Sequence, residues 1–256
     1  MIEHYLRPKS INEALELLST PGAIPLAGGT FVNSPEFSKA NRHLAEYTSL
    51  SVVDLQELGL NQIRKQGNNL EIEACVTLQQ LCENRHSPED LKRSIKQEAP
   101  LNIRNAATVA GTLIACDGRS SFATAMLALD AKLVIQPGEL ELHLGNILPL
   151  RNSLAKGKLI TKIIIPLNAH LKFEYVARSP SDRPIVCTAV AQWTSGRTRL
   201  ALGGYGAAPL LAMDGTTDDD IQSAARNGYH ESGDEWASAE YRADVAAVLA
   251  KRCLSI

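Results

Sequence analysis

The sequence predicts an α+β protein with two domains. Its 256 residues exceed the roughly 100–200 residues of a usual domain, and 45% of them are hydrophobic, enough to form cores without a disulfide or a metal. Up to about residue 167, strand and helix patterns alternate. Beyond Asn168-Ala169-His170, strand patterns follow one another and two helix patterns close the chain. Strands followed by helices are typical of a separate α+β unit, so domains are expected at 1–167 and 168–256.

Capping signals in the sequence predict where several helices begin. Capping-box patterns begin at Ser10 and Thr77, each with Glu or Gln three residues later, and Pro88 stands at the first position of a third helix. Further helices are expected from their sequence patterns at Phe122–Leu129, Asp218–Asn227 and Glu235–Cys253.

Strands are predicted where apolar residues alternate with polar ones or form short runs. The expected strands cover 24–27, 51–55, 70–76, 131–135, 140–144, 159–166, 172–177, 185–193 and 198–203. Thr194-Ser195-Gly196-Arg197, between the last two, is a hairpin signal.

Composition excludes two classes of partner. Lys and Arg total 26 against 28 Asp and Glu, so the basic face of a nucleic-acid binder is not expected. Aromatic residues make up only 5%, too few for a base-stacking platform. No apolar run approaches the roughly 20 residues needed to cross a bilayer, and residues 1–5 lack a signal-peptide pattern. We therefore expect a soluble, cytoplasmic protein with no membrane span.

No metal site is expected from the residues that usually bind metals. The cysteines are scattered without a CxxC pair, and the histidines show no HExxH pattern. Three consecutive aspartates, Asp218–Asp220, are better explained as the acidic first turn of a helix capped by Thr217. The cysteines are Cys75, Cys82, Cys116, Cys187 and Cys253.

Two glycine-containing segments are the candidate binding loops, Pro25–Phe31 and Ile103–Thr112. Both combine small side chains with threonine hydroxyls, so backbone N–H groups can approach an anion closely. Facing each other, the two loops are suited to a pyrophosphate, although each taken singly is also compatible with a plain turn. The sequence contains no GxSxG, Walker or helix-opening GxGxxG motif, and no catalytic residue is assigned.

The sequence resembles the FAD-binding subunit, or medium chain, of the molybdenum hydroxylases, the family of xanthine dehydrogenase and carbon monoxide dehydrogenase. The resemblance covers nearly the whole chain and depends on motifs that occur in the family's order. These motifs are the opening Tyr5–Leu18 ("RP-S-EAL-LL"), the first loop Pro25–Thr30 ("AGGT"), the second loop Ile103–Thr112 ("IRN-ATVGGN"), Leu127–Ala131 ("LLALDA"), and Phe173–Arg178 with Gly203-Gly204.

The resemblance implies a two-lobed PCMH-type FAD-binding domain, similar to that of vanillyl-alcohol oxidase, with lobes at roughly 1–52 and 53–167. A C-terminal α+β domain like that of the CO dehydrogenase flavoprotein, with a small antiparallel sheet and helices, would follow at 168–256. FAD would lie between the lobes. The residues expected to bind it are Leu26, Ala27, Gly28, Gly29, Thr30, Phe31, Val32, Thr108, Ala110, Gly111, Thr112, Ile114 and Ser121.

The same resemblance implies an oxidoreductase subunit that transfers electrons and performs no hydroxylation itself. An iron–sulfur subunit would deliver electrons from a molybdopterin subunit, and NAD or another acceptor would receive them from the flavin. We expect Gly28→Val to abolish FAD retention while the fold survives, whereas an ordinary turn glycine would lose stability instead.

Departures from the family pattern leave alternatives open. The second loop reads Ala110-Gly111-Thr112 where the family has Gly-Gly-Asn, and Ser121 stands in place of an Asp. These departures motivate a second interpretation, a structural or assembly subunit of the same fold that has lost its flavin. A stand-alone flavin oxidase or reductase is the third, disfavoured by the lack of an acid–base residue set.

Overall fold

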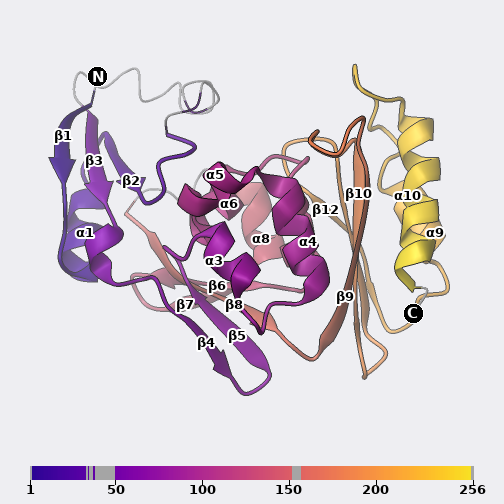
Figure 1. The fold of residues 1–256 in the computed structure, drawn as a ribbon, viewed down its shortest axis with the longest axis horizontal. Coiled ribbons are helices and arrows are strands. Elements are labelled where there is room, and N and C mark those ends of the chain that lie inside the picture. The colour runs from indigo at the N-terminus through magenta and orange to yellow at the C-terminus, as the bar shows by residue number, and fades with distance from the viewer. Residues whose placement is uncertain (1, 33, 35–36, 38–49, 152–156, 255–256) are drawn as a thin grey trace.

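Three β-sheets, with helices between and beside them, organise the chain (Figure 1). The computed structural model describes residues 2–32, 34, 37, 50–151 and 157–254. The three sheets follow one another along the long axis of the molecule, from the N-terminal sheet through a helical layer to the C-terminal sheet and its covering helices. The α+β class expected from the sequence is confirmed.

The first sheet is parallel and has the order β1-β3-β2. Its elements are β1 (Ile2–Leu6), α1 (Ile11–Leu18), β2 (Ala23–Leu26) and β3 (Leu50–Asp54). The Ser10 side chain accepts a hydrogen bond from the Glu13 amide. The Glu13 carboxylate accepts from the backbone amide of Lys9 and not from that of Ser10, so only half of the expected capping box forms. The expected lobe limit at residue 52 falls inside β3, because that strand must reach Asp54 to pair with Leu26.

The second sheet is antiparallel and has the order β4-β5-β8-β6-β7. Its strands are β4 (Ile63–Gln66), β5 (Asn69–Glu73), β6 (Lys132–Gln136), β7 (Leu140–His143) and β8 (Leu159–Pro166). Alternating burial along β8 matches the period of a strand with one face in the core.

Short helices form the layer that covers this sheet. They are α3 (Leu78–Glu83), α4 (Glu89–Glu98), α5 (Leu101–Ala106), α6 (Val109–Ala115), α7 (Ser121–Ala128) and α8 (Leu144–Ile147). Two 3-10 turns also occur, η2 (Gln56–Leu58) after β3 and η3 (Leu148–Leu150) after α8. Thr77 and Gln80 make both bonds of the expected capping box. Pro88 is the N-cap of α4 and not its first residue. The segment expected as a loop, Ile103–Thr112, contains most of α5 and the start of α6.

The third sheet is antiparallel, with order β12-β11-β10-β9, and two helices cover its outer face. Its elements are β9 (Ala169–Val176), β10 (Val186–Trp193), β11 (Thr198–Gly203), β12 (Leu210–Gly215), α9 (Ile221–Asn227) and α10 (Ala239–Leu254). No sequence pattern predicts β12, because it is a half-exposed edge strand without alternation. The expected Thr217 cap is wrong, because α9 begins after Asp220.

One hydrophobic core joins the second and third sheets through α7. Every residue of α7 is buried, and the helix packs against α4, β10 and β11. Its Phe122 is fully buried, which contributes about 1.5–3 kcal/mol to folding. A single cluster of buried hydrophobic residues includes both Leu70 in β5 and Ala201 in β11. The segments expected as two domains therefore share one hydrophobic core.

The loop between α6 and α7 is tied to the turn that follows β11. The Gly118 amide donates to Gly206 O at 2.9 Å, and the Gly204 amide donates to Gly118 O at 2.6 Å. A Cβ on Gly118 would lie 1.7 Å from Tyr205 O, closer than any real contact. The two backbones therefore touch because residue 118 has no side chain.

We expect Gly118→Ala to destabilise the protein by at least about 2 kcal/mol, because the added methyl must displace backbone atoms. Urea unfolding measures the change through the midpoint at unchanged slope. Gly145→Ala is the matched control. Its Cβ would meet only Leu127 Cδ1 at 3.4 Å, and alanine favours the helix α8. Equal midpoints for Gly118→Ala and the unsubstituted chain would contradict the tie between these loops.

Candidate functional site

The first glycine loop leaves β2 at Leu26 and presents free backbone donors. Gly29 has φ of 69°, a left-handed conformation that glycine adopts without strain. Among the residues that the structure describes, the amides of Gly28, Gly29 and Thr30 donate no hydrogen bond. All three residues are partly exposed, so their N–H groups are available to an anion.

The second loop is held in place at Thr108, between α5 and α6. Thr108 pairs with Thr77 in an isolated β-bridge and caps α6 by accepting a hydrogen bond from the Gly111 amide at 3.2 Å. The Thr112 hydroxyl donates to Thr108 O at 2.8 Å. The Thr112 hydroxyl proton is thus donated within the helix. Toward a ligand, the Thr112 oxygen could only accept a hydrogen bond.

The two loops touch through their backbones. A Cβ on Gly28 would lie 1.9 Å from Ala106 O and 3.2 Å from Ala107 Cα. Gly28→Val would therefore force the loops apart. The expectation that the fold survives this substitution is wrong, because the added side chain would displace backbone atoms of Ala106 and Ala107. If Gly28→Val lost its flavin, the result would not show whether the substitution blocked binding or disrupted the packing of the two loops.

Three cavities meet around this contact and form one cleft. A loop-side cavity of about 460 Å³ and an apolar cavity of about 740 Å³ share Ala27 and Thr108. The apolar cavity shares Gly111, Ile114 and Arg151 with a polar cavity of about 1530 Å³. These volumes include the open mouths of the cavities.

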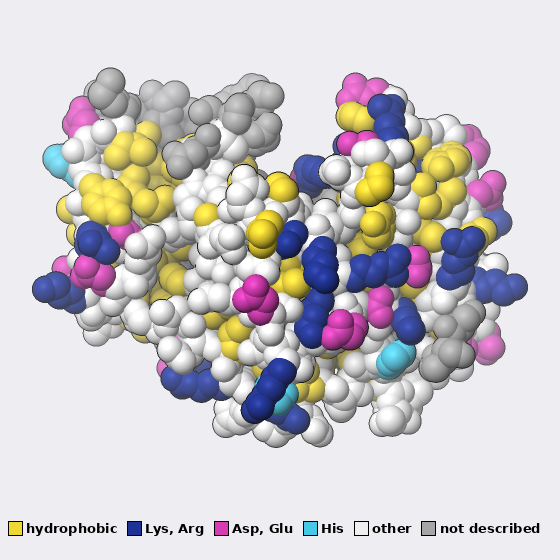
Figure 2. All heavy atoms as spheres, in the orientation of Figure 1, with side chains coloured by type: hydrophobic (Ala, Val, Ile, Leu, Met, Phe, Trp, Pro, Cys, Tyr) yellow, Lys and Arg dark blue, Asp and Glu magenta, His cyan; other side chains and the backbone are white. Residues whose placement is uncertain are grey.

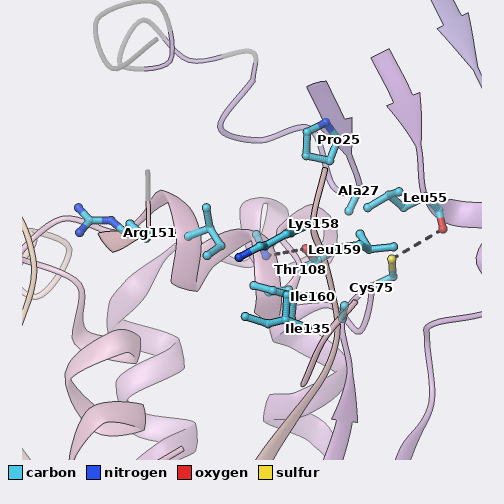
Figure 3. A pocket seen from close by; sticks show the side chains of 14 residues that line it. Pro25, Ala27, Leu55, Cys75, Thr108, Ile135, Arg151, Lys158, Leu159 and Ile160 are labelled. Atoms are coloured by element: carbon cyan, nitrogen blue, oxygen red, sulfur yellow. Dashed lines mark hydrogen bonds between the residues drawn. The ribbon is translucent and has the colours of Figure 1, made fainter. Parts of the chain in front are cut away.

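The apolar cavity is lined mainly by aliphatic side chains, and Lys158 is also among the residues that line it (Figure 3). Its aliphatic wall includes Leu55, Ile135, Leu159 and Ile160. Cys75 is also in the lining, and its thiol lies 3.8 Å from Leu55 O. Burial, reinforced by Asp54 and Glu73, raises the pKa of Cys75 to about 11, so it is a neutral thiol near pH 7.

The polar cavity carries ionisable groups on the side nearest the C-terminal sheet. Glu98 accepts hydrogen bonds from Ser120 Oγ at 2.8 Å and from the Phe122 amide at 2.9 Å. Burial raises the pKa of Glu98, although these two bonds oppose the shift. Asp117 forms a two-pronged ion pair with Arg183, which lowers the pKa of Asp117 against the opposing effect of burial.

Arg151 joins the elements around the cleft and points away from the aliphatic wall (Figure 3). Its guanidinium donates to Leu148 O at 2.6 Å, to Cys116 O at 3.0 Å and to Ala207 O at 2.5 Å. Ala207 follows β11, so this side chain connects the second lobe to the C-terminal part of the chain.

Nine of the thirteen residues expected from the sequence line the cleft. They are Ala27, Gly28, Thr30, Phe31, Thr108, Ala110, Gly111, Thr112 and Ile114. Leu26, Gly29 and Val32 lie in or beside the first loop but are not among the residues that line these three cavities. Ser121 is fully buried at the start of α7, its hydroxyl has no partner among the described residues, and it is not among the residues that line these cavities.

Sequence reasoning missed Arg151, Lys158, Cys75, Glu98 and Arg183. No local motif marks them, because they reach the cleft from separate helices, loops and strands. The "IRN" arginine, Arg104, holds Gln79 and Ala99 O and takes no part in the lining.

The residues present fit FAD. Unused amides on the first loop suit a diphosphate, and the absent side chain of Gly28 lets the two loops meet. The adjoining cavities offer one apolar and one polar compartment for flat rings.

We expect the Cys75 thiol of the folded protein to react with iodoacetamide only as pH approaches about 11, because the thiolate is the nucleophile. Mass spectrometry of the labelled peptide across pH measures the midpoint. The urea-unfolded chain is the control and should show a midpoint near ~8.5. A midpoint near that value in the folded protein would refute the burial argument.

Metal-binding clusters and membrane-spanning helices are not found in the part of the chain that the structure describes. No group of three or more His, Cys, Asp or Glu side chains there could hold a metal ion. Among the described helices, none has the length and apolar character needed to cross a membrane.

Known proteins are similar to this chain over nearly its full length. The Escherichia coli (strain K12) protein YgfM is 28% identical over 97% of this chain and 94% of its own. The 6-hydroxypseudooxynicotine dehydrogenase complex subunit alpha of Paenarthrobacter nicotinovorans is 26% identical over 98% and 93%. The reconstituted CO dehydrogenase from Oligotropha carboxidovorans has a chain with the same fold, with a TM-score of 0.77, 23% identity, and coverage of 99% and 97%.

The family model for the FAD binding domain in molybdopterin dehydrogenase matches residues 1–168, which include both glycine loops. This match confirms the resemblance inferred from the motifs, the FAD cofactor and the oxidoreductase class. This chain belongs to the FAD-binding domain family of the molybdopterin dehydrogenases.

Proposed function

We propose that this chain holds FAD in the cleft and is the electron-transfer subunit of a molybdenum hydroxylase-type complex. Bound FAD would supply a redox centre that exchanges electrons singly or in pairs. The observation that carries the proposal is the pair of touching loops, with the free amides of Gly28–Thr30 opposite Thr108. Neutral amide dipoles can hold a diphosphate here without a lysine.

The two ends of the cleft support different parts of the cofactor. Leu55, Ile135 and Ile160 would pack against the adenine, which is flat and weakly polar at its faces. Phe31, Asp117 and Arg183 line the polar cavity, which would take the flavin ring and its hydrogen-bonding edge. Both compartments reach the loops, so one extended molecule can occupy them together.

Partner chains complete the proposed function. An iron–sulfur subunit would deliver electrons taken from substrate by a molybdopterin subunit, and NAD or another acceptor would receive them. The relative from Paenarthrobacter nicotinovorans, similar over nearly its whole length, is named as a subunit of a dehydrogenase complex. We place this assembly in the cytoplasm, with the FAD-binding domain at residues 1–167 and the C-terminal domain at 168–256.

A larger side chain in the cleft tests whether FAD binds there. We expect the purified chain to contain FAD, and Ala110→Leu to lower the FAD bound per chain at least about ten-fold, because Ala110 lines the apolar cavity beside Thr108. Visible absorption and identification of the cofactor released by denaturation measure the content. Ala224→Leu is the matched control, since Ala224 lines a groove between β12 and α9 outside the cleft.

Two outcomes would contradict this proposal. A colourless chain that takes up no added FAD, alone or with its partners, would favour the flavin-depleted assembly subunit, whose buried Ser121 and altered second loop would then explain the loss. Equal FAD content in Ala110→Leu and Ala224→Leu would move the cofactor out of this cleft.

Electron transfer is tested in the assembled complex. We expect the pre-reduced iron–sulfur partner to bleach the visible flavin absorption of this chain anaerobically, and an acceptor to restore it. The isolated chain mixed with reduced small-molecule dye is the control for a reducible flavin. Bleaching by the dye but not by the partner would refute the electron-transfer role while leaving FAD binding intact.

A further inference from the structure

A carboxyl group with one unused oxygen lies where α4, α7 and the polar cavity meet. Glu98 is the last residue of α4, a helix that packs against α7 and against β9 of the C-terminal sheet (Figure 1). Glu98 is partly exposed and lines the polar cavity. Figure 2 shows a hollow in the surface beside the projecting end of the C-terminal part. A ligand in the polar cavity can therefore reach the Glu98 side chain.

One carboxyl oxygen of Glu98 is fixed on the start of α7. Oε2 accepts a hydrogen bond from Ser120 Oγ at 2.8 Å and another from the Phe122 amide at 2.9 Å. Both Ser120 and Phe122 are fully buried, so this anchor belongs to the interior of the protein. Within the described part of the chain, Oε1 makes no hydrogen bond. Oε1 is therefore the oxygen that remains for a ligand.

The surroundings of Glu98 favour the neutral form of its carboxyl group. Among the described residues, no cation lies at ion-pair distance from Glu98, and the nearby Arg183 is paired with Asp117. Glu98 also ends a helix, where the helix dipole disfavours a negative charge. Burial and the charge of Asp117 raise the pKa of Glu98, against the two hydrogen bonds and the charge of Arg183.

The anchor on α7 determines which oxygen of the neutral acid carries the proton. Oε2 already accepts two hydrogen bonds, which use its two lone pairs. The proton is therefore on Oε1, which becomes a hydrogen-bond donor. Asp117 differs, because the ion pair with Arg183 lowers its pKa against the effect of burial. Two carboxyl groups in one cavity with pKa values shifted in opposite directions are typical of functional sites.

We propose that Glu98 positions the flavin ring by donating a hydrogen bond from Oε1 into the polar cavity. Its acceptor would be a carbonyl oxygen or an unprotonated nitrogen at the polar edge of the ring. This inference rests on the proposed function, which places the ring in that cavity. Ser121, the residue expected here from the sequence, lies between the two anchor residues and does not line the cavity, and Glu98 supplies the polar contact in its place.

FAD binding should depend on pH through this group. Ionisation of Glu98 removes the donor and sets a negative charge against the acceptor, so FAD binds tightly below the raised pKa of Glu98 and more weakly above it. The charges that act on Glu98 are those of Asp117 and Arg183, and α7 has no ionisable side chain. The other ionisable groups of the cavity and of the elements packed against α4 are Cys116, Arg151, Cys82 and Glu83 on α3, and His170, Lys172, Glu174 and Tyr175 on β9.

The test measures the dissociation constant of FAD on the flavin-stripped full-length chain between about pH 5 and 9, a range that covers a raised glutamate pKa. We expect the affinity of the unsubstituted chain to fall at least about ten-fold as pH rises, the effect of losing one hydrogen bond. Glu98→Gln should keep the acid-side affinity at every pH. Its amide oxygen accepts the same two bonds, and its NH₂ group donates without titrating.

Glu83→Gln is the matched control. It removes the same charge from the C-terminal end of α3, outside the three cavities, and should follow the profile of the unsubstituted chain. Titration of FAD itself affects all three chains alike. Urea unfolding should give Glu98→Gln the midpoint of the unsubstituted chain, because the anchor on α7 is kept. If Glu98→Gln does not fold, infrared spectra of the unsubstituted chain replace it, and the protonated carboxyl band should shift when FAD binds.

Parallel profiles for the unsubstituted chain and Glu98→Gln, weaker binding by Glu98→Gln at the acid end, or an unshifted infrared band would overturn this inference. Tight FAD binding with parallel profiles rejects this inference alone and leaves the proposed function intact. Absence of FAD binding by every chain at every pH rejects the proposed function, and this inference with it.

Discussion

The contact of Gly28 with the backbone of Ala106 and Ala107 is the constraint on which the cleft depends. A Cβ at residue 28 would lie 1.9 Å from Ala106 O, so the two segments can approach this closely at residue 28 only because it is glycine. Residues of the two glycine-containing segments line all three cavities, the loop-side, the apolar and the polar one. Gly28 thus has a packing role, and its position in the lining of the loop-side cavity supports the binding role proposed for it.

The C-terminal part of the chain shapes one wall of the same cleft. The turn after β11 exchanges backbone hydrogen bonds with Gly118, Arg151 binds Ala207 O, and Arg183 pairs with Asp117. All three connections end on the segment 116–118 or on a residue that lines the polar cavity. Together with the continuous core through α7, they make the C-terminal sheet a support for the site and not a separate appendage.

Charge in the cleft is arranged unevenly. The glycine loops offer neutral dipoles, and Thr112, which stands in place of the family's asparagine, spends its hydroxyl on Thr108 O. The charged residues that line the cleft come from other segments: Lys158 lines the apolar cavity, Arg151 lines both the apolar and the polar cavity, and Glu98 and the Asp117–Arg183 pair line the polar cavity. The Asp117–Arg183 pair places one negative and one positive charge together in the lining of the polar cavity.

The sequence by itself determined the local elements and the two loops. Alternation marked β5 and β7, an apolar run marked β8, and Thr77 marked the start of α3, since these signals depend on neighbours a few residues away. Tertiary structure alone decided three matters. It brought Arg151, Arg183 and Cys75 to the cleft from distant segments, buried Ser121 away from it, and added the edge strand β12. Each of these outcomes depends on contacts between residues far apart in the chain, and local periodicity carries no record of such contacts.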